Sequence, residues 1–292
     1  MKKTSIFFLI ISIALIITGN VLRNNALKAA DEQDIKLFQQ TLNEDNNLVE
    51  RIDFPADDTN KINLSLKETD INIIGGAEKC YAEIVNLNSI EYSAYVNNRS
   101  FNIDSDIISA MVGRAEGGKI SFNGVRDYLR FDKHNTEKTV NIYITNDSTV
   151  KIFNIKLENG NVNIKNMADK VCDFTVTLDN GNVYVSDTNK ISLLDVEIKN
   201  GNVDIDNSYI LNTDISIENG NVDFKTQSNI IYDYSIQNEA GKITVNSEEY
   251  KGKYETTNET PNGQFVSYVG VGNTTVTLLE PVAEDFDNTD SE

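Results

Sequence analysis

The sequence is short of several residue types on which enzyme chemistry depends. Among its 292 residues there is no tryptophan, and there are three prolines, two cysteines and a single histidine, His134. General acid–base catalysis often uses histidine, and metal sites usually gather several histidine, cysteine or carboxylate side chains. A lone histidine in the polar stretch 131–135 is most often solvent-exposed, and no serine elbow, phosphate loop or H-E-x-x-H motif occurs. We therefore expect no catalytic, cofactor-binding or metal-binding residues, and no enzyme.

Positive charge is also scarce. The chain has 26 lysines and arginines against 45 aspartates and glutamates, which gives a net charge of −19. A chain this acidic is repelled by nucleic acid and by anionic lipid headgroups, so a nucleic-acid-binding role is excluded. The charge would suit a cationic partner such as a basic peptide or a metal ion, but an acidic surface that keeps a β-protein soluble is the simpler explanation.

The two cysteines, Cys80 and Cys172, do not form a C-x-x-C motif, which gives no support to a zinc or thioredoxin-like site. An exported domain would permit a disulfide. Because the two lie far apart in sequence, we favour two separate buried residues, and a disulfide stays open.

An apolar run, Ser5–Leu22, follows two lysines at the N-terminus. At 1.5 Å per residue, about 18 to 20 residues cross a hydrocarbon core of roughly 30 Å. Residues 1–22 therefore predict a single-pass transmembrane helix, with the N-terminus cytoplasmic and the remaining chain outside. The alternative is a signal peptide cleaved near Ala29 or Ala30, or after Gly19, which would make the protein secreted.

Three further regions follow the membrane segment. Residues 23–58 are a polar spacer in which Ile35, Phe38, Leu42 and Val49 have helical spacing, so we expect a short juxtamembrane helix there. Residues 59–280 form the main domain. Residues 281–292 predict a disordered acidic tail.

The main domain contains an internal repeat. The sequence Asn-Gly-Asn-Val occurs four times, and a fifth, degenerate copy ends in Ile243-Thr244-Val245. The corresponding glycines are 21, 20, 19 and 21 residues apart, at positions 160, 181, 201, 220 and 241. Apolar and polar residues alternate on both sides of each glycine, which predicts strands with one buried and one wet face.

Earlier segments have the same alternation, though more weakly. We expect strands over 62–66, 71–73, 81–86, 91–96, 101–104, 119–123 and 139–145, and a final strand over 274–279.

Two all-β folds fit this pattern. Asn-Gly between alternating strands is a hairpin signal, which predicts an antiparallel sheet closed as a sandwich. A near-constant period of about 20 residues instead favours a β-solenoid, or β-helix, in which each coil stacks on the last. We favour the solenoid, in which equivalent asparagines would form ladders at the corners and glycine would supply a positive φ.

The repeat, placed behind an N-terminal membrane segment, resembles the domain-of-unknown-function 4097 family of proposed adhesins with β-strand repeats. The resemblance covers about residues 60–280 and carries no catalytic residues. It implies an elongated β-solenoid on the bacterial cell surface, linked to adhesion or envelope stress. This chain has Asn-Gly where the family commonly has Ser-Gly or Gly-Gly.

Two series of side chains recur at fixed repeat positions. Glu158, Asp179, Lys199 and Glu218 occupy one position, and a second position is occupied by Asn163, Tyr184, Asp204 and Asp223. A polysaccharide-cleaving β-helix would cluster such acids, but solvated outer faces explain them more simply. The calcium-binding repeat G-G-x-G-x-D is absent, and Gly117-Gly118 is a turn.

We therefore expect a membrane-anchored, non-catalytic binding module whose partner is an envelope, cell-surface or protein component. The outward rows of Asn, Asp, Tyr and Thr would make the contact. A module that docks another membrane protein, and a polysaccharide-active enzyme, are the alternatives.

Overall fold

The computed structural model describes residues 41–42, 47–87, 92–105, 137–167 and 172–279. Every regular element in this part of the chain is a β-strand, so the predicted all-β class is confirmed. Within the described ranges no helix has the length and apolar character needed to cross a membrane. The expected membrane segment, the strand over 119–123, His134 and the acidic tail lie outside the described residues.

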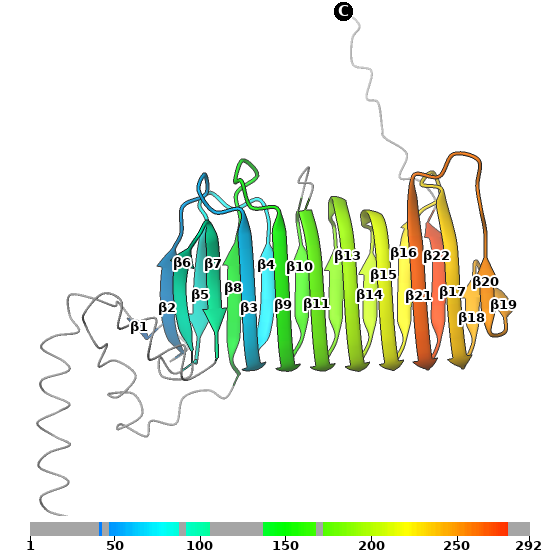
Figure 1. Cartoon of the computed structure of the whole chain (residues 1–292), viewed down its shortest axis with the longest axis horizontal. Helices are drawn as coiled ribbons and strands as arrows, with labels where there is room; N and C mark the ends of the chain where they lie inside the picture. The colour runs from blue at the N-terminus through cyan, green and yellow to red at the C-terminus, as the bar shows by residue number, and fades with distance from the viewer. Residues whose placement is uncertain (1–40, 43–46, 88–91, 106–136, 168–171, 280–292) are drawn as a thin grey trace, which may run out of the picture.

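The strands form two sheets that lie face to face as a long slab (Figure 1). The 12-stranded sheet contains, in spatial order, β1 (Thr41–Leu42), β2 (Leu48–Asp53), β5 (Tyr81–Val85), β8 (Thr139–Tyr143), β4 (Asp70–Ile74), β10 (Val162–Lys165), β12 (Val183–Ser186), β14 (Val203–Asp206), β16 (Val222–Gln227), β22 (Thr274–Leu279), β18 (Ile243–Val245) and β19 (Glu248–Tyr250). The 10-stranded sheet contains β20 (Lys253–Glu255), β17 (Tyr232–Ala240), β21 (Gly263–Val271), β15 (Tyr209–Asn219), β13 (Asn189–Asn200), β11 (Cys172–Asn180), β9 (Ile152–Asn159), β3 (Lys61–Glu68), β7 (Ser100–Asp104) and β6 (Ser93–Asn97).

Each repeat makes one coil, with one strand in each sheet. The chain runs along β11 in the 10-stranded sheet, turns at Asn180-Gly181-Asn182, and returns along β12 in the 12-stranded sheet. Strands of successive repeats pair parallel and in register, as Val183, Val203 and Val222 do. The solenoid prediction is therefore confirmed, and the hairpin interpretation is wrong because Asn-Gly joins strands of different sheets.

Glycine is required at this corner because the coils approach each other there. Gly181 has a φ of 148°, and a Cβ on it would lie 1.8 Å from the carbonyl oxygen of Gly160. Gly201 and Gly220 repeat the relationship, at 1.6 and 1.5 Å from the preceding glycine oxygen. No side chain fits in that space, which explains why the glycine recurs with the repeat.

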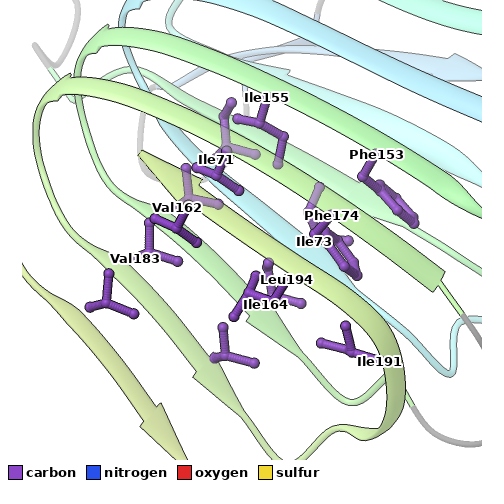
Figure 2. Packing of buried hydrophobic residues seen from close by; sticks show 14 of the residues in the cluster. Ile71, Ile73, Phe153, Ile155, Val162, Ile164, Phe174, Val183, Ile191 and Leu194 are labelled. Atoms are coloured by element: carbon purple, nitrogen blue, oxygen red, sulfur yellow. The ribbon is translucent and has the colours of Figure 1, made fainter. Parts of the chain in front are cut away.

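The core lies between the two sheets, where the inward-facing residues of both meet (Figure 2). Phe153 and Phe174 stack with ring centroids 4.4 Å apart, and both side chains are fully buried. Facing them from the 12-stranded sheet are Ile73 and Ile164, which are also buried. Repeated burial of aliphatic and aromatic columns is the main source of stability in such a stack.

The coils do not stack in sequence order, contrary to the expectation that each would lie on the last. At one end β7 and β8 lie outside β3 and β4, which pair on their other side with β9 and β10. At the other end the last coil, β21 and β22, lies between the β15–β16 coil and the β17–β18 coil. The fifth repeat is therefore next to the C-terminal coil and not next to the fourth repeat.

Antiparallel strands close both ends of the slab. β6 pairs with β7, and β5 and β2 extend the other sheet beyond β8. At the far end the short strands β20 and β19 cover β17 and β18. β19 and β20 are short and charged, which discourages edge-to-edge pairing with another chain at that end.

The helix expected in the spacer is wrong for the residues that the structure describes there. Leu48–Asp53 is strand β2, which pairs antiparallel with β5. Glu50 points into the core, is 4% exposed, and accepts a hydrogen bond from the hydroxyl of the buried Tyr92. The packed structure therefore includes residues that precede the repeats.

Both cysteines are free and buried, as we favoured. The Cys80 thiol lies 3.6 Å from the hydroxyl of Thr145, and Cys172 lies near the carbonyl of Val150. Each therefore acts as a small core residue in a different coil.

Candidate binding faces

The two outer faces of the slab present side chains in straight rows, because neighbouring parallel strands are in register. We define the 12-sheet row as the central row on the 12-stranded sheet: Asn141, Asn72, Asn163, Tyr184, Asp204, Asp223 and Thr275. We define the 10-sheet row as its counterpart on the other sheet: Asn102, Asn63, Asn154, Thr175, Asp195, Asp214 and Val266. Both rows change from amides to carboxylates along the slab.

The amide half of each row is bonded internally. In the 12-sheet row, Asn163 donates to Asn72 at 2.8 Å and Asn72 donates to Asn141 at 2.7 Å. In the 10-sheet row, Asn154 donates to Asn63 at 2.9 Å. These side chains stabilise the stack and offer few free groups to a ligand.

The carboxylate half of the 12-sheet row has unpaired acceptors. Asp204 and Asp223 are neighbours, and the Oδ1 atom of each is buried without a hydrogen-bond partner among the described residues. Lys225 binds the other oxygen of Asp223 at 3.2 Å. Burial raises the pKa of Asp204, and the charges of Asp223 and Asp206 raise it further against the opposing effect of Lys225. Tyr184, next in the row, is 41% exposed.

In the carboxylate half of the 10-sheet row, two neighbouring aspartates repel each other. Asp195 and Asp214 are direct neighbours across β13 and β15. Burial raises the pKa of Asp195, and the charges of Asp214 and Glu197 add to the rise. In the described ranges no lysine or arginine forms an ion pair with either aspartate. A cationic group placed over this pair would relieve the repulsion.

The series at positions 158, 179, 199 and 218 lies beside the glycine corner. Glu158, Lys199 and Glu218 are exposed, and Lys199 pairs with Asp179 at 2.7 Å. This arrangement is the solvated face expected from the sequence. Across the residues that the structure describes, no three histidine, cysteine or carboxylate side chains are placed to hold a metal ion.

A pocket of about 310 Å³ lies beside the first corner, and its lining includes Leu66, Thr69, Leu87 and Lys138. Thr69 lies next to Gly160, the first of the corner glycines, and is 5% exposed. Its hydroxyl has no hydrogen-bond partner among the described residues. On the outer side of this corner, the backbone N–H of Asp70 donates to the carbonyl oxygen of Lys138 at 3.0 Å.

The sequence of this chain matches the profile of the Toastrack DUF4097 family over residues 59–260. The chain belongs to the Toastrack DUF4097 family. The resemblance inferred from the sequence is therefore confirmed.

Several solved structures are similar to this Toastrack chain. A proposed cell adhesion protein from Clostridium sporogenes is 17% identical, with a TM-score of 0.45, and the match covers 80% of this chain and 99% of that one. A proposed adhesin from Bacteroides fragilis is 13% identical, with a TM-score of 0.31 over 78% and 96% of the two chains. A proposed lipid-binding protein from Parabacteroides distasonis is 10% identical, with a TM-score of 0.25 over 80% and 95%. No curated protein matches the chain.

The second corner of each coil was not predicted from the sequence. Asn166, Asp187 and Asn207 have φ values of 57°, 50° and 45°, and each reverses the chain after the strand in the 12-stranded sheet. Each lies six residues after its corner glycine, at 160, 181 and 201. Asn and Asp tolerate this left-handed conformation better than other residues, so their recurrence at that spacing was the available signal.

Proposed function

We propose that this Toastrack chain is a non-catalytic binding module outside the cytoplasm, and that the carboxylate halves of the 12-sheet row and the 10-sheet row are its contact surfaces. The observation that carries the proposal is the pair Asp195 and Asp214, which lie side by side on a flat outer face without a cation among the described residues. A partner that presents amine or guanidinium groups gains charge complementarity there.

The partner that fits this chemistry is a cationic component of a cell surface or of an envelope protein. Both faces are flat and regularly spaced, which suits an extended partner better than a small molecule in a cleft. The net charge of −19 also favours a positively charged partner.

The binding test compares three double variants in the full-length chain, each of which removes two negative charges. The first is Asp195→Asn with Asp214→Asn, the second is Asp204→Asn with Asp223→Asn, and the matched control is Glu158→Gln with Glu218→Gln at the exposed corner. We expect one or both face variants to reduce binding to cells or isolated envelope at least about tenfold, while the control binds as the parent does. Equal binding by all three would overturn the proposal.

Cross-linking on whole cells then separates general adhesion from docking onto another membrane protein. Products spread over many envelope components support adhesion. A single partner that is lost in the same face variant supports docking.

We also propose that residues 1–22 anchor the chain in the membrane, since Ser5–Leu22 has the length and apolar character of a spanning helix. Retention in the membrane pellet after alkaline extraction, together with digestion of the domain by protease added outside cells, is the expected result. Recovery of the chain in the medium with its N-terminus near Ala30 would contradict the anchor.

A further inference from the structure

The C-terminal coil occupies a slot that the fifth repeat could fill. Gly241 lies 21 residues after Gly220, which is the same interval that separates Gly160 from Gly181. By spacing alone the β17–β18 coil would stack directly on the β15–β16 coil. In the structure the β21–β22 coil separates them, with parallel pairing on both of its sides.

Two buried polar residues mark the boundary of this slot. Asn238 on β17 is 3% exposed and Thr274 on β22 is fully buried. The Thr274 hydroxyl donates to Asn238 Oδ1 at 2.9 Å. Asn238 Nδ2 donates to the carbonyl oxygens of Lys242 and Gly272, at 3.0 and 3.1 Å. Every polar atom of the Asn238 side chain is therefore satisfied when the C-terminal coil is in place.

The same positions are apolar in the other coils. The column that contains Asn238 otherwise holds Leu66, Leu157, Leu178, Ile198, Ile217 and Val269. The column that contains Thr274 otherwise holds Ile71, Val162, Val183, Val203, Val222 and Ile243. Asn238 and Thr274 thus replace aliphatic residues at two facing places in adjacent coils, and they bind each other.

We infer that Asn238 keeps the slot open for the C-terminal coil and that Thr274 is the group that completes it. If β17 and β18 docked directly on β15 and β16, Val222 would stand where Thr274 stands now. The Oδ1 atom of Asn238 would then be buried against an aliphatic side chain with no donor. Burying an unsatisfied acceptor costs free energy, so premature closure is disfavoured until residues 263–279 arrive.

The geometry offers a direct reporter of coil order. On the outer face Asp214, Val266 and Ser235 lie on successive strands in register. Neighbouring strands are about 4.8 Å apart, so Asp214 and Ser235 are about twice that distance apart in this order. A disulfide needs Cα atoms closer than about 7 Å. Cysteines at 214 and 266 therefore report the observed order, and cysteines at 214 and 235 report premature closure.

The test follows oxidative cross-linking of these pairs during refolding of the full-length chain from denaturant. The reporters are Asp214→Cys with Val266→Cys, and Asp214→Cys with Ser235→Cys. In the parent background we expect the first pair to cross-link and the second to stay near zero at all times. Adding Asn238→Leu should raise early cross-linking of the 214–235 pair about tenfold or more, because the unpaired acceptor is gone.

Thr274→Val separates the two roles. It should leave the 214–235 cross-link at the parental level, since Asn238 still opposes closure, while the C-terminal coil exchanges its amides faster. Ser267→Ala removes a different buried hydroxyl, on β21 of the same coil. It is the matched control and should change neither readout. The inference is overturned if Asn238→Leu leaves the 214–235 cross-link unchanged, or if the parent chain forms that cross-link readily.

Discussion

The carboxylate of Asp70 accepts two hydrogen bonds from Asn161, one from its backbone N–H at 2.8 Å and one from its Nδ2 at 3.1 Å. This pair begins a ladder along the glycine corner, which we call the corner ladder. Its further members repeat the same two bonds: Asn182, Asn202, Asn221 and Asn273. Because every donor in the ladder points the same way, its first member needs only acceptors, which a carboxylate supplies.

The corner ladder should matter more for stability than the second amide ladder beside it. Asn182→Ala removes the acceptor for the N–H and the amide of Asn202, so we expect a loss of about 1–3 kcal/mol in the free energy of unfolding. Asn180→Ala, the control, removes an exposed side chain whose bonds join side chains only, and should cost less than about 1 kcal/mol. Urea denaturation of both variants measures the difference, and equal losses would contradict the assignment.

Gly201→Ala should be among the most damaging single substitutions in the chain. Its Cβ would lie 1.6 Å from the Gly181 oxygen, at a φ of 155°. Two coils would have to separate, so we expect a loss of more than about 4 kcal/mol or failure to fold. Gly252→Ala is the control, because its φ of 76° is strained but no atom lies within 4 Å. That variant should lose about 1–2 kcal/mol, as thermal unfolding would show.

Alkaline pH should destabilise the fold through Tyr232. Burial raises its pKa to about 12, against the effect of its hydrogen bond to the carbonyl of Ile210. The unfolded chain loses the phenolic proton first, near its ordinary pKa of about 10. The stability that the protonated Tyr232 contributes to the fold is therefore fully present below about pH 10, and it is lost as pH rises from about 10 to 12.

Unfolding midpoints measured across that pH range test this point. In Tyr232→Phe the free energy of unfolding should fall by up to about 2 kcal/mol less over this pH range than in the parent. The variant also loses the hydrogen bond at neutral pH. Tyr184→Phe is the control, because Tyr184 is exposed. An unchanged slope in Tyr232→Phe would assign the alkaline loss elsewhere.

Removing charge from the 10-sheet row should stabilise the domain at neutral pH. The raised pKa of Asp195 means that the folded chain disfavours the charged carboxylate. The penalty is absent at acid pH and develops as pH rises through the folded pKa, so Asp195→Asn should gain a few tenths of a kcal/mol at pH 7 and nothing near pH 3. Added salt should shrink the gain. Glu158→Gln, at an exposed corner position, should change stability little in the same denaturant series.

The sequence predicted the coil well because the repeat is set by local requirements. A glycine such as Gly181 is needed wherever two corners meet. The alternation of apolar and polar residues around it determines which side chains face inward. Strand β2 was missed for a physical reason. Glu50 occupies an inward position and is satisfied by Tyr92, so a buried polar residue hides the period of two that marks a strand.

The periodicity of the sequence does not predict the order in which the coils stack. The corner glycine of the β17–β18 coil keeps the spacing of the other repeats, although Asn238 replaces an aliphatic residue there. The place of this coil in the stack depends on contacts between Asn238 and Thr274, which lie 36 residues apart. Asp204 and Asp223 were correctly aligned from the sequence, whereas the neighbours Asp195 and Asp214 were not singled out. That the Oδ1 atoms of Asp204 and Asp223 are buried and unpaired could be seen only from the three-dimensional arrangement of both strands.

The out-of-order coils at both ends restrict how such a protein can change its length in evolution. Each end is a fixed assembly in which strands distant in sequence interlock, so a repeat appended beyond either one would meet a short antiparallel edge strand, such as β20 or β6, and not the long parallel edge of another coil. The middle coils, from β11 to β14, are interchangeable because each presents the same corner and the same pairing to its neighbours. Duplication of one such block of about 20 residues would lengthen the slab by one strand spacing, about 4.8 Å, and leave both terminal assemblies intact.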